Sequence, residues 1–392
     1  SYMRNIDLKM AEINKKFKAQ IINQGTDIIE VAKIPFSSPT ANWMTYGGIP
    51  VGKITEFFGG EGGGKTTSAL DICANAQKKF NEVFEQHREK VLDEIEQLKE
   101  KDTKESKKKA DKLMSDLMEY VERGPRVVVY IDAEQTLDVQ WAQLLGVDTE
   151  AMILVRPQEQ TAEQVLQIAI DLIATGDVGL CVLDSIPMLV SQNIFNEDMD
   201  KKSYGGISQA LTVFCSKVTP HLTQQQCAFI GINQIREDLA SMYNTVSTPG
   251  GKMWKHACSL RLRFRKDTLL DMNNGELTSR AENPAGNRVG IEIAKTKVCK
   301  PDRRIGYYTL NYTEGIDVLA DIITVALQYR ILKQGGSWYY YLDEEGNVEV
   351  DAENNEIKFQ GKAKLLDELR NDEEFKEDVI SRLNKVMYNE NK

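Results

Sequence analysis

The sequence lacks the features of a membrane or secreted protein. No apolar run approaches the roughly 18 residues that a membrane-spanning helix requires. Arg4, Asp7 and Lys9 interrupt the N-terminal stretch too early for a secretory signal peptide. None of the six cysteines forms a C-x-x-C pair, so a disulfide framework or a cysteine metal site is not expected. We therefore expect a cytoplasmic protein that has no membrane partner.

An overall excess of positive charge is also missing. The 392 residues carry a net charge of −10, which argues weakly against nucleic acid as a partner. The charge is uneven, however: residues 343–392 hold fifteen Asp and Glu against eight Lys and Arg, whereas residues 252–266 hold six Lys and Arg and no acid. Because a local basic strip can bind a phosphate backbone while the whole chain stays acidic, a nucleic-acid site is compatible with this composition.

A glycine-rich stretch at residues 59–66 fits the phosphate-loop pattern G-x-x-x-x-G-K-[ST]. Residues 53–58 before it read as a strand and residues 67–77 after it as a helix, which is the context that the motif needs. Backbone N–H groups of the glycines and the helix N-terminus favour a phosphate. Lys65 is expected to reach the β- and γ-phosphates of ATP, and the Thr66 hydroxyl to hold Mg²⁺. The expected ATP-binding residues here are Gly59, Gly60, Glu61, Gly62, Gly63, Gly64, Lys65 and Thr66.

The remainder of the core predicts an α/β fold. Three apolar strands alternate with two helices, at residues 126–131, 160–175, 179–183, 208–223 and 228–232. This alternation predicts a mostly parallel sheet that helices cover on both faces. Residues 259–266 and 289–295 read as further strands, which we expect in an antiparallel extension of the sheet.

Polar side chains follow the three strands, at the edge where open α/β sheets place their ligands. Asp184 follows four apolar residues and is expected to organise Mg²⁺, with Ser185 assisting by a hydrogen bond. Glu134 could orient the water that attacks the γ-phosphate, and Gln234 could sense that phosphate. From the residues alone, each of these two fits a structural cap equally well.

Two polar loops interrupt the core, at residues 193–206 and 235–251. Loops longer than about 12 residues are usually functional or disordered. Apolar or aromatic loop residues beside cations suit insertion between DNA bases or stacking on them, and the alternative is a pair of surface loops ordered by subunit contacts. The candidate DNA-binding residues are Lys201 and Lys202 in the first loop and Arg236, Met242, Tyr243, Gly250 and Gly251 in the second.

Further modules flank or interrupt this core. An apolar stripe predicts a helix at residues 5–22, and residues 27–31 read as a short strand. This N-terminal arm is too small to bury its own core. An inserted segment carries two apolar stripes around a charged stretch, which predicts an antiparallel helical hairpin, and a solvated coiled coil accounts for its interspersed charges. The expected domains are the arm at residues 1–34, the ATPase core at 35–316 with the hairpin at 78–124, and a small α+β domain at 317–392.

Taken together, these residues resemble the bacterial RecA family of ATP-dependent DNA strand-exchange recombinases. The resemblance covers roughly residues 5–75 and 126–385. Several motifs in the right order are more specific than the phosphate loop alone. The matching stretches are Gly47-Gly48-Ile49-Pro50, the phosphate loop with Thr67, Ile131-Asp132-Ala133-Glu134, Leu145-Gly146-Val147-Asp148, Val182-Leu183-Asp184-Ser185, Ile232-Asn233-Gln234-Ile235-Arg236 and Ser259-Leu260-Arg261-Leu262.

The resemblance implies roles for these residues in a RecA-type core that binds ATP and Mg²⁺ between subunits. Glu134 matches the catalytic glutamate, and Gln234 matches the γ-phosphate switch at the root of the second DNA-binding loop. That loop would place Arg236 on DNA and insert Met242 and Tyr243. Thr67 is a further implied ATP contact, and Asp138 and Trp141 match positions that flank the adenine. Lys295 and Lys297 match a lysine pair that would reach the ATP of a neighbouring subunit.

The implied activity is homologous recombination. The chain would form a helical filament on single-stranded DNA through its N-terminal arm, hydrolyse ATP, pair with homologous duplex DNA and exchange strands. A single-strand binding protein or a loader would be a further partner. Two other functions stay open: a hexameric DNA helicase on the same core, and an ATP-gated recombination mediator that barely hydrolyses ATP.

Three features depart from the ordinary bacterial pattern. The segment at residues 78–124 has no counterpart there, His256 stands where the family has an interface phenylalanine, and the composition of the first loop is shifted. These departures suggest a phage-encoded or accessory homologue.

Overall fold

The computed structural model describes residues 3–17, 31–189, 205–237 and 246–389. The chain divides into two compact units, residues 1–32 and residues 33–392. The described part of the first unit holds helix α1 (Asn5–Phe17), which the apolar stripe of the arm predicts. The strand expected at residues 27–31 lies outside the described residues except for Val31.

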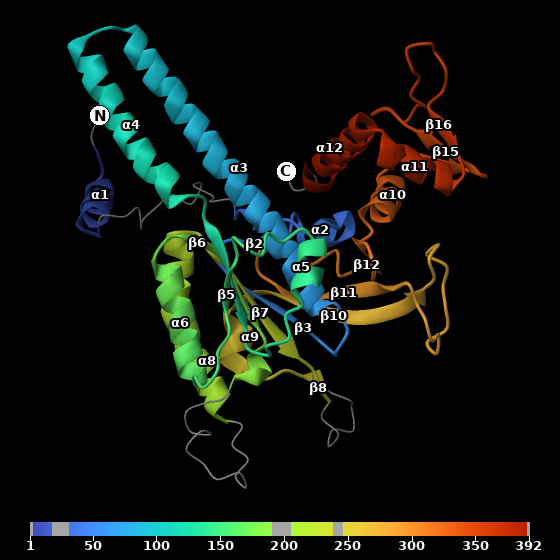
Figure 1. Ribbon diagram of the computed structural model, residues 1–392, viewed down its shortest axis with the longest axis horizontal. Helices are drawn as coiled ribbons and strands as arrows, with labels where there is room; N and C mark the ends of the chain where they lie inside the picture. The colour runs from blue at the N-terminus through green and yellow to red at the C-terminus, as the bar shows by residue number, and fades with distance from the viewer. Residues whose placement is uncertain (1–2, 18–30, 190–204, 238–245, 390–392) are drawn as a thin grey trace. The chain divides into compact units, whose positions relative to one another are not determined.

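A nine-stranded sheet forms the centre of the second unit (Figure 1). Its strand order is β13-β12-β11-β10-β3-β7-β6-β4-β5. The strands are β3 (Ile54–Gly59), β4 (Val127–Asp132), β5 (Ile153–Val155), β6 (Val178–Asp184), β7 (Ala228–Gln234), β10 (Cys258–Leu270), β11 (Gly286–Thr296), β12 (Ile305–Asn311) and β13 (Gly315–Ile316). Neighbours from β5 to β10 pair in parallel, and those from β10 to β13 pair antiparallel. The predicted parallel sheet with an antiparallel extension is confirmed.

Helices cover both faces of this sheet, because its central strands are apolar at successive positions, which point alternately to the two faces. Val128 and Tyr130 pack with the helices of one face, whereas Val129 and Ile131 pack with those of the other. The first face is covered by α2 (Pro39–Thr45), α3 (Lys65–Glu100) and α5 (Val139–Leu144). The second is covered by α6 (Ala162–Ala174), α8 (Gly205–Gln225) and α9 (Gly251–Ala257).

The first helix of the inserted hairpin is a direct continuation of the phosphate-loop helix. The sequence interpretation ended that helix at Gln77, and the structure corrects this: α3 runs without a break to Glu100, because no glycine or proline interrupts it. Helix α4 (Lys104–Arg123) returns antiparallel to it (Figure 1), beginning at a Thr103 capping box. A small apolar seam of Val91, Ile95, Ala110 and Leu117 holds the two helices together.

The C-terminal part of the second unit has its own apolar cluster. It contains α10 (Val318–Gln328), the three-stranded sheet of β14 (Leu332–Gly335), β15 (Trp338–Tyr341) and β16 (Lys358–Gln360), and the helices α11 (Lys362–Asn371) and α12 (Glu373–Asn389). Asp321 of α10 fastens this part to α2, since its carboxylate accepts hydrogen bonds from Ser38 and Thr40.

The remaining short elements are β1 (Lys33–Ile34), which pairs with β2 (Ile49–Pro50), the 3₁₀ helix η1 (Ile186–Met188), and β8 (Arg236–Glu237), which pairs with β9 (Val246–Ser247). Within the described ranges, no helix has the length and apolar character needed to cross a membrane.

Candidate nucleotide site

The phosphate loop joins the end of β3 to the start of α3, as the motif requires. Gly64 caps the helix with a left-handed backbone, at φ 92°, and a Cβ atom there would lie 2.9 Å from a Val289 methyl group. A Cβ atom on Gly59 would lie 2.2 Å from the Phe264 carbonyl oxygen. These two positions accept only glycine, because neither the backbone conformation nor the space allows a side chain.

Lys65 begins α3 and is buried, at 8% exposure. Its Nζ atom donates hydrogen bonds to the carbonyl oxygens of Gly59, at 2.8 Å, and Asn233, at 3.2 Å. Burial lowers the pKa of Lys65, and the nearby carboxylates of Asp184, Glu134 and Glu61 oppose that shift. The ammonium group is therefore held between the ends of β3 and β7, where a phosphate would meet it.

Asp184 lies at the end of β6 beside the start of α3. Its Oδ2 atom accepts hydrogen bonds from Thr66 Oγ1, at 3.0 Å, and from the Tyr130 hydroxyl, at 2.5 Å. Burial raises the pKa of Asp184, whereas these two hydrogen bonds lower it. Tyr130 was missed at the sequence level, although a hydroxyl in an otherwise apolar buried strand needs a partner and was a usable signal.

The Thr66–Asp184 pair is chemically suited to Mg²⁺, which prefers hard oxygen ligands. Across the described residues, no group of three or more His, Cys, Asp or Glu could hold a metal ion. Mg²⁺ bound with a nucleotide needs only one or two protein ligands, because waters and phosphate oxygens complete its coordination. One hydroxyl and one carboxylate therefore fit that requirement.

Glu134, Ser185 and Gln234 meet beside this pair, although they come from three different strand ends. Glu134 Oε1 accepts a hydrogen bond from Ser185 Oγ at 2.7 Å and from Gln234 Nε2 at 3.3 Å. The expected hydrogen bond of Ser185 is thus present, but its partner is Glu134. Because the three side chains are linked, a change at Gln234 can reach the carboxylate of Glu134 directly.

Trp141 lies against the phosphate-loop helix. Its Nε1 atom donates a hydrogen bond to Thr67 Oγ1 at 3.1 Å. Asp138 caps the N-terminus of α5, where its Oδ1 atom accepts from the Trp141 backbone N–H at 3.1 Å. Asp138 is exposed, and its carboxylate caps the start of α5 at the backbone of Trp141.

Lys295 lies near the end of β11 and Lys297 directly follows that strand. Both contact the C-terminal end of α9. Lys295 Nζ donates to the carbonyl oxygens of Lys255, at 2.7 Å, and His256, at 3.0 Å. Lys297 Nζ donates to the His256 carbonyl at 3.2 Å. Two cations at the carbonyl end of a helix are favourable, so within one chain this pair caps α9.

The candidate DNA-binding residues are only partly described. Lys201, Lys202, Met242 and Tyr243 lie outside the described residues. Arg236 lies on β8, which pairs antiparallel with β9, so the ends of the segment read as a loop form a short two-stranded ribbon. Gly250 and Gly251 adopt φ values of 114° and 74° and turn the chain from β9 into α9.

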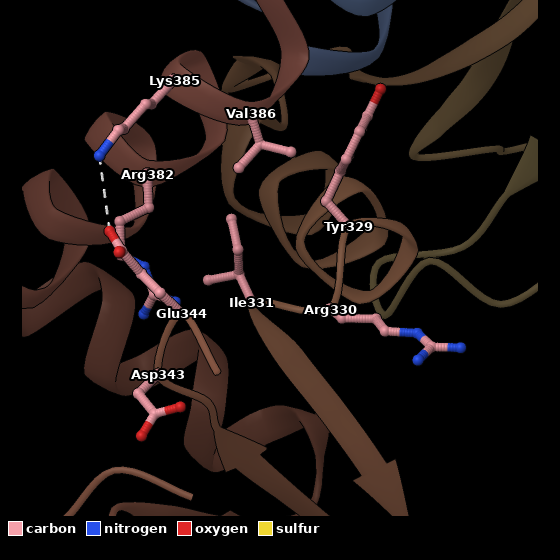
Figure 2. Close-up of a pocket in the computed structure, with 8 residues that line it drawn as sticks. All are labelled: Tyr329, Arg330, Ile331, Asp343, Glu344, Arg382, Lys385 and Val386. Carbon is pink, nitrogen blue, oxygen red and sulfur yellow. Dashed lines mark ion pairs between the residues drawn. The ribbon is translucent and has the colours of Figure 1, made fainter. Parts of the chain in front are cut away.

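A separate pocket of about 410 Å³ lies on the C-terminal part of the second unit (Figure 2). Arg330, Arg382 and Lys385 line it together with Asp343 and Glu344. Lys385 Nζ and Glu344 Oε1 form an ion pair at 3.5 Å. Its charges are of both signs and it includes none of the residues that the sequence singles out, so we assign it no part in nucleotide chemistry.

Comparison with known proteins finds relatives of one family along most of the chain. The family model described as the RecA N-terminal domain matches residues 4–100 and 100–317. The Protein RecA of Aquifex pyrophilus is 31% identical over 343 residues, covering 86% of this chain and 82% of that protein. The Protein RecA of Clostridium acetobutylicum is 29% identical, covering 87% and 83%. The Protein RecA of Lactobacillus johnsonii is 28% identical, covering 99% and 98%.

Proposed function

The chain belongs to the RecA family, and from this premise we propose how its residues perform the family's reaction. It is a DNA-dependent ATPase and an ATP-dependent homologous recombinase, which binds DNA and assembles as a filament. The observation that carries the residue assignment is the meeting of Glu134, Ser185 and Gln234 beside the phosphate loop.

ATP binds with its phosphates on the phosphate loop, in this proposal. The backbone N–H groups from Gly60 to Thr66 and the N-terminus of α3 surround the phosphates. Lys65 moves from its two carbonyl partners to the β- and γ-phosphates, since a phosphate oxygen is a stronger partner for an ammonium group than a neutral carbonyl. Trp141 and Asp138 flank the adenine.

Thr66 and Asp184 hold Mg²⁺, which neutralises the charge of the phosphate oxygens when it is bound. Tyr130 keeps the Asp184 carboxylate in place through its hydrogen bond. Glu134 positions the attacking water, and Ser185 orients the Glu134 carboxylate. Catalysis of phosphoryl transfer is mainly positioning and charge stabilisation, so one oriented carboxylate is sufficient for this role.

Gln234 couples this chemistry to DNA. It touches Glu134 and stands one residue before the segment at 235–251, where Arg236, Met242, Tyr243, Gly250 and Gly251 contact single-stranded DNA. Lys201 and Lys202 belong to a second DNA-contacting segment. Lys295 and Lys297 leave the α9 carbonyls and reach the ATP of a neighbouring subunit, which makes hydrolysis depend on filament assembly.

Single-stranded DNA and a homologous duplex are the substrates of strand exchange, and residues 1–34 dock subunits in the filament. A single-strand binding protein or a loader is a further partner in this proposal. The proposed location is the cytoplasm, where both ATP and DNA occur in a bacterial cell.

ATP hydrolysis measured with and without single-stranded DNA tests the assignment, on the wild type and on Glu134→Gln at fixed salt. We expect strong stimulation by DNA in the wild type and a loss of at least 100-fold in Glu134→Gln, a typical size for removing one oriented catalytic group. Glu150→Gln, in an exposed turn, is the matched control and should hydrolyse ATP normally. Full turnover in Glu134→Gln would contradict its catalytic role, and turnover indifferent to DNA would contradict the coupling.

A further inference from the structure

We propose that Glu56 is a positioning residue that couples the nucleotide site to the segment at 235–251. It acts through Asn233, Trp254 and Arg261, and we call these four residues the Glu56 cluster. The inference rests on the proposed function, because it concerns how the state of the γ-phosphate reaches the DNA-binding segment.

The Glu56 cluster lies on the sheet face that α6, α8 and α9 cover. Glu56 is fully buried on β3, three residues before the phosphate loop begins. Its Oε1 atom accepts a hydrogen bond from Arg261 Nε at 2.8 Å. Its Oε2 atom accepts from Asn233 Nδ2 at 3.1 Å and from the Trp254 indole N–H. One carboxylate thus joins three donors from β10, β7 and α9.

Trp254 reaches Glu56 only because the neighbouring strand carries a glycine. A Cβ atom on Gly231 would lie 2.6 Å from the Trp254 ring, and Gly231 pairs directly with Glu56 across β3 and β7. The indole is completely buried in this gap. Trp254 therefore fixes helix α9 to the sheet next to the carboxylate.

The cluster touches the nucleotide site through Asn233. The Asn233 carbonyl accepts the hydrogen bond from Lys65 Nζ at 3.2 Å, and Asn233 Oδ1 accepts from the Gln234 backbone N–H at 3.0 Å. When Lys65 turns toward a γ-phosphate, the Asn233 carbonyl loses this hydrogen bond. A shift of the Gln234 backbone changes the contact with Asn233 Oδ1. Asn233 is thus the residue through which the nucleotide site touches the cluster.

The same cluster holds the far end of the DNA-binding segment. Asn233 Nδ2 also donates to the Pro249 carbonyl at 2.7 Å, and an Arg261 terminal nitrogen lies 3.4 Å from Thr248 Oγ1. Trp254 follows in α9, whose last carbonyls receive Lys295 and Lys297. Gln234, directly before the segment, and Thr248 and Pro249, near its end, are therefore tied to one buried carboxylate.

A buried carboxylate links its donors tightly, because losing one hydrogen-bond donor destabilises the fold by a large free energy. If Asn233 shifts with the nucleotide, Glu56 must follow it or leave one of its oxygens unpaired. Trp254 and Arg261 then follow Glu56. This shared acceptor explains how a change at the γ-phosphate can move α9 and the end of the DNA-binding segment together.

The experiment measures the coupling between nucleotide binding and DNA binding. The affinity for single-stranded DNA is determined with a saturating non-hydrolysable ATP analogue and without nucleotide, and the coupling is the ratio of the two affinities. Fluorescence anisotropy at one salt concentration gives both affinities, since DNA affinity depends steeply on salt. Trp254→Phe keeps the ring and removes the indole donor, and Gly231→Ala displaces the ring without changing any donor. Trp338→Phe, on β15 of the C-terminal part, is the matched control. Thermal unfolding of every variant checks that it is folded.

We expect the analogue to tighten DNA binding in the wild type and in Trp338→Phe by a factor within the 5- to 150-fold range typical of allosteric coupling. In Trp254→Phe and Gly231→Ala this ratio should fall at least fivefold, while DNA affinity without nucleotide and affinity for the analogue stay within about twofold. A merely structural role would weaken both DNA affinities equally and leave the ratio unchanged, which would overturn the inference. A wild-type ratio of one would instead overturn the proposed function.

Discussion

Replacement of Tyr130 by phenylalanine removes the hydroxyl that donates to Asp184 Oδ2 at 2.5 Å and changes little else, because the ring is completely buried. A hydrogen bond to a charged group is worth about 1.5–3 kcal/mol. We therefore expect the free energy of unfolding to fall by about 2 kcal/mol, and Tm by roughly 3 °C for a unit of this size.

The same substitution should alter the pH dependence of catalysis. The Tyr130 hydroxyl stabilises the ionised form of Asp184 and so lowers its pKa. Without that hydroxyl, the pKa of Asp184 rises further above its ordinary value. Since the ionised carboxylate is the form that holds Mg²⁺, the acid limb of DNA-stimulated ATP hydrolysis should move to higher pH, and more Mg²⁺ should be needed for half-maximal rate.

Tyr308→Phe is the matched control for this experiment. Tyr308 is also buried, but its hydroxyl lies 2.6 Å from the Ser68 hydroxyl and contacts no carboxylate in the described structure. The control should lose about 1 kcal/mol of stability with no change in the acid limb. If Tyr130→Phe also left the acid limb and the Mg²⁺ requirement unchanged while its Tm fell, the assignment of Asp184 as the Mg²⁺ carboxylate would be refuted.

Two further changes test the phosphate loop and the core. Lys65→Ala should abolish ATP-driven filament formation on single-stranded DNA, seen by electron microscopy, because the β- and γ-phosphates lose their cation; retained strand exchange would contradict this. Burial raises the pKa of Asp71 to about 6 from its ordinary value of 3.8, so its proton stabilises the fold below pH 4 and this contribution, about 3 kcal/mol, is lost as pH rises through 6. Asp71→Asn should remove that pH dependence. Urea unfolding at pH 4.5 and 7 measures it as the difference between the two free energies of unfolding. An unchanged difference in the variant would show that another group titrates.

Local patterns in the sequence were sufficient for the phosphate loop, the alternating strands and helices, and the antiparallel pair of β10 and β11. Each depends on neighbours in the chain: glycine spacing, apolar runs of strand length, and polar residues directly after them. The hairpin was also visible in its two apolar stripes. Its continuity with α3 was not, because the change from a buried to an exposed helix alters the composition without interrupting the backbone.

Tertiary structure alone decided which side chains meet. Glu134, Ser185 and Gln234 are separated by up to 100 residues, and only the strand order β7-β6-β4 brings them together. For Tyr130 and Glu56 the sequence indicates only that a polar group in an apolar strand needs a partner, because it does not identify that partner. The contacts of Lys295 and Lys297 with α9 likewise depend on the packing of distant elements. Sequence by itself determined the chemistry available to this protein, because short motifs carry it, whereas the fold decided how the groups are connected, because hydrogen bonds depend on distances that only packing sets.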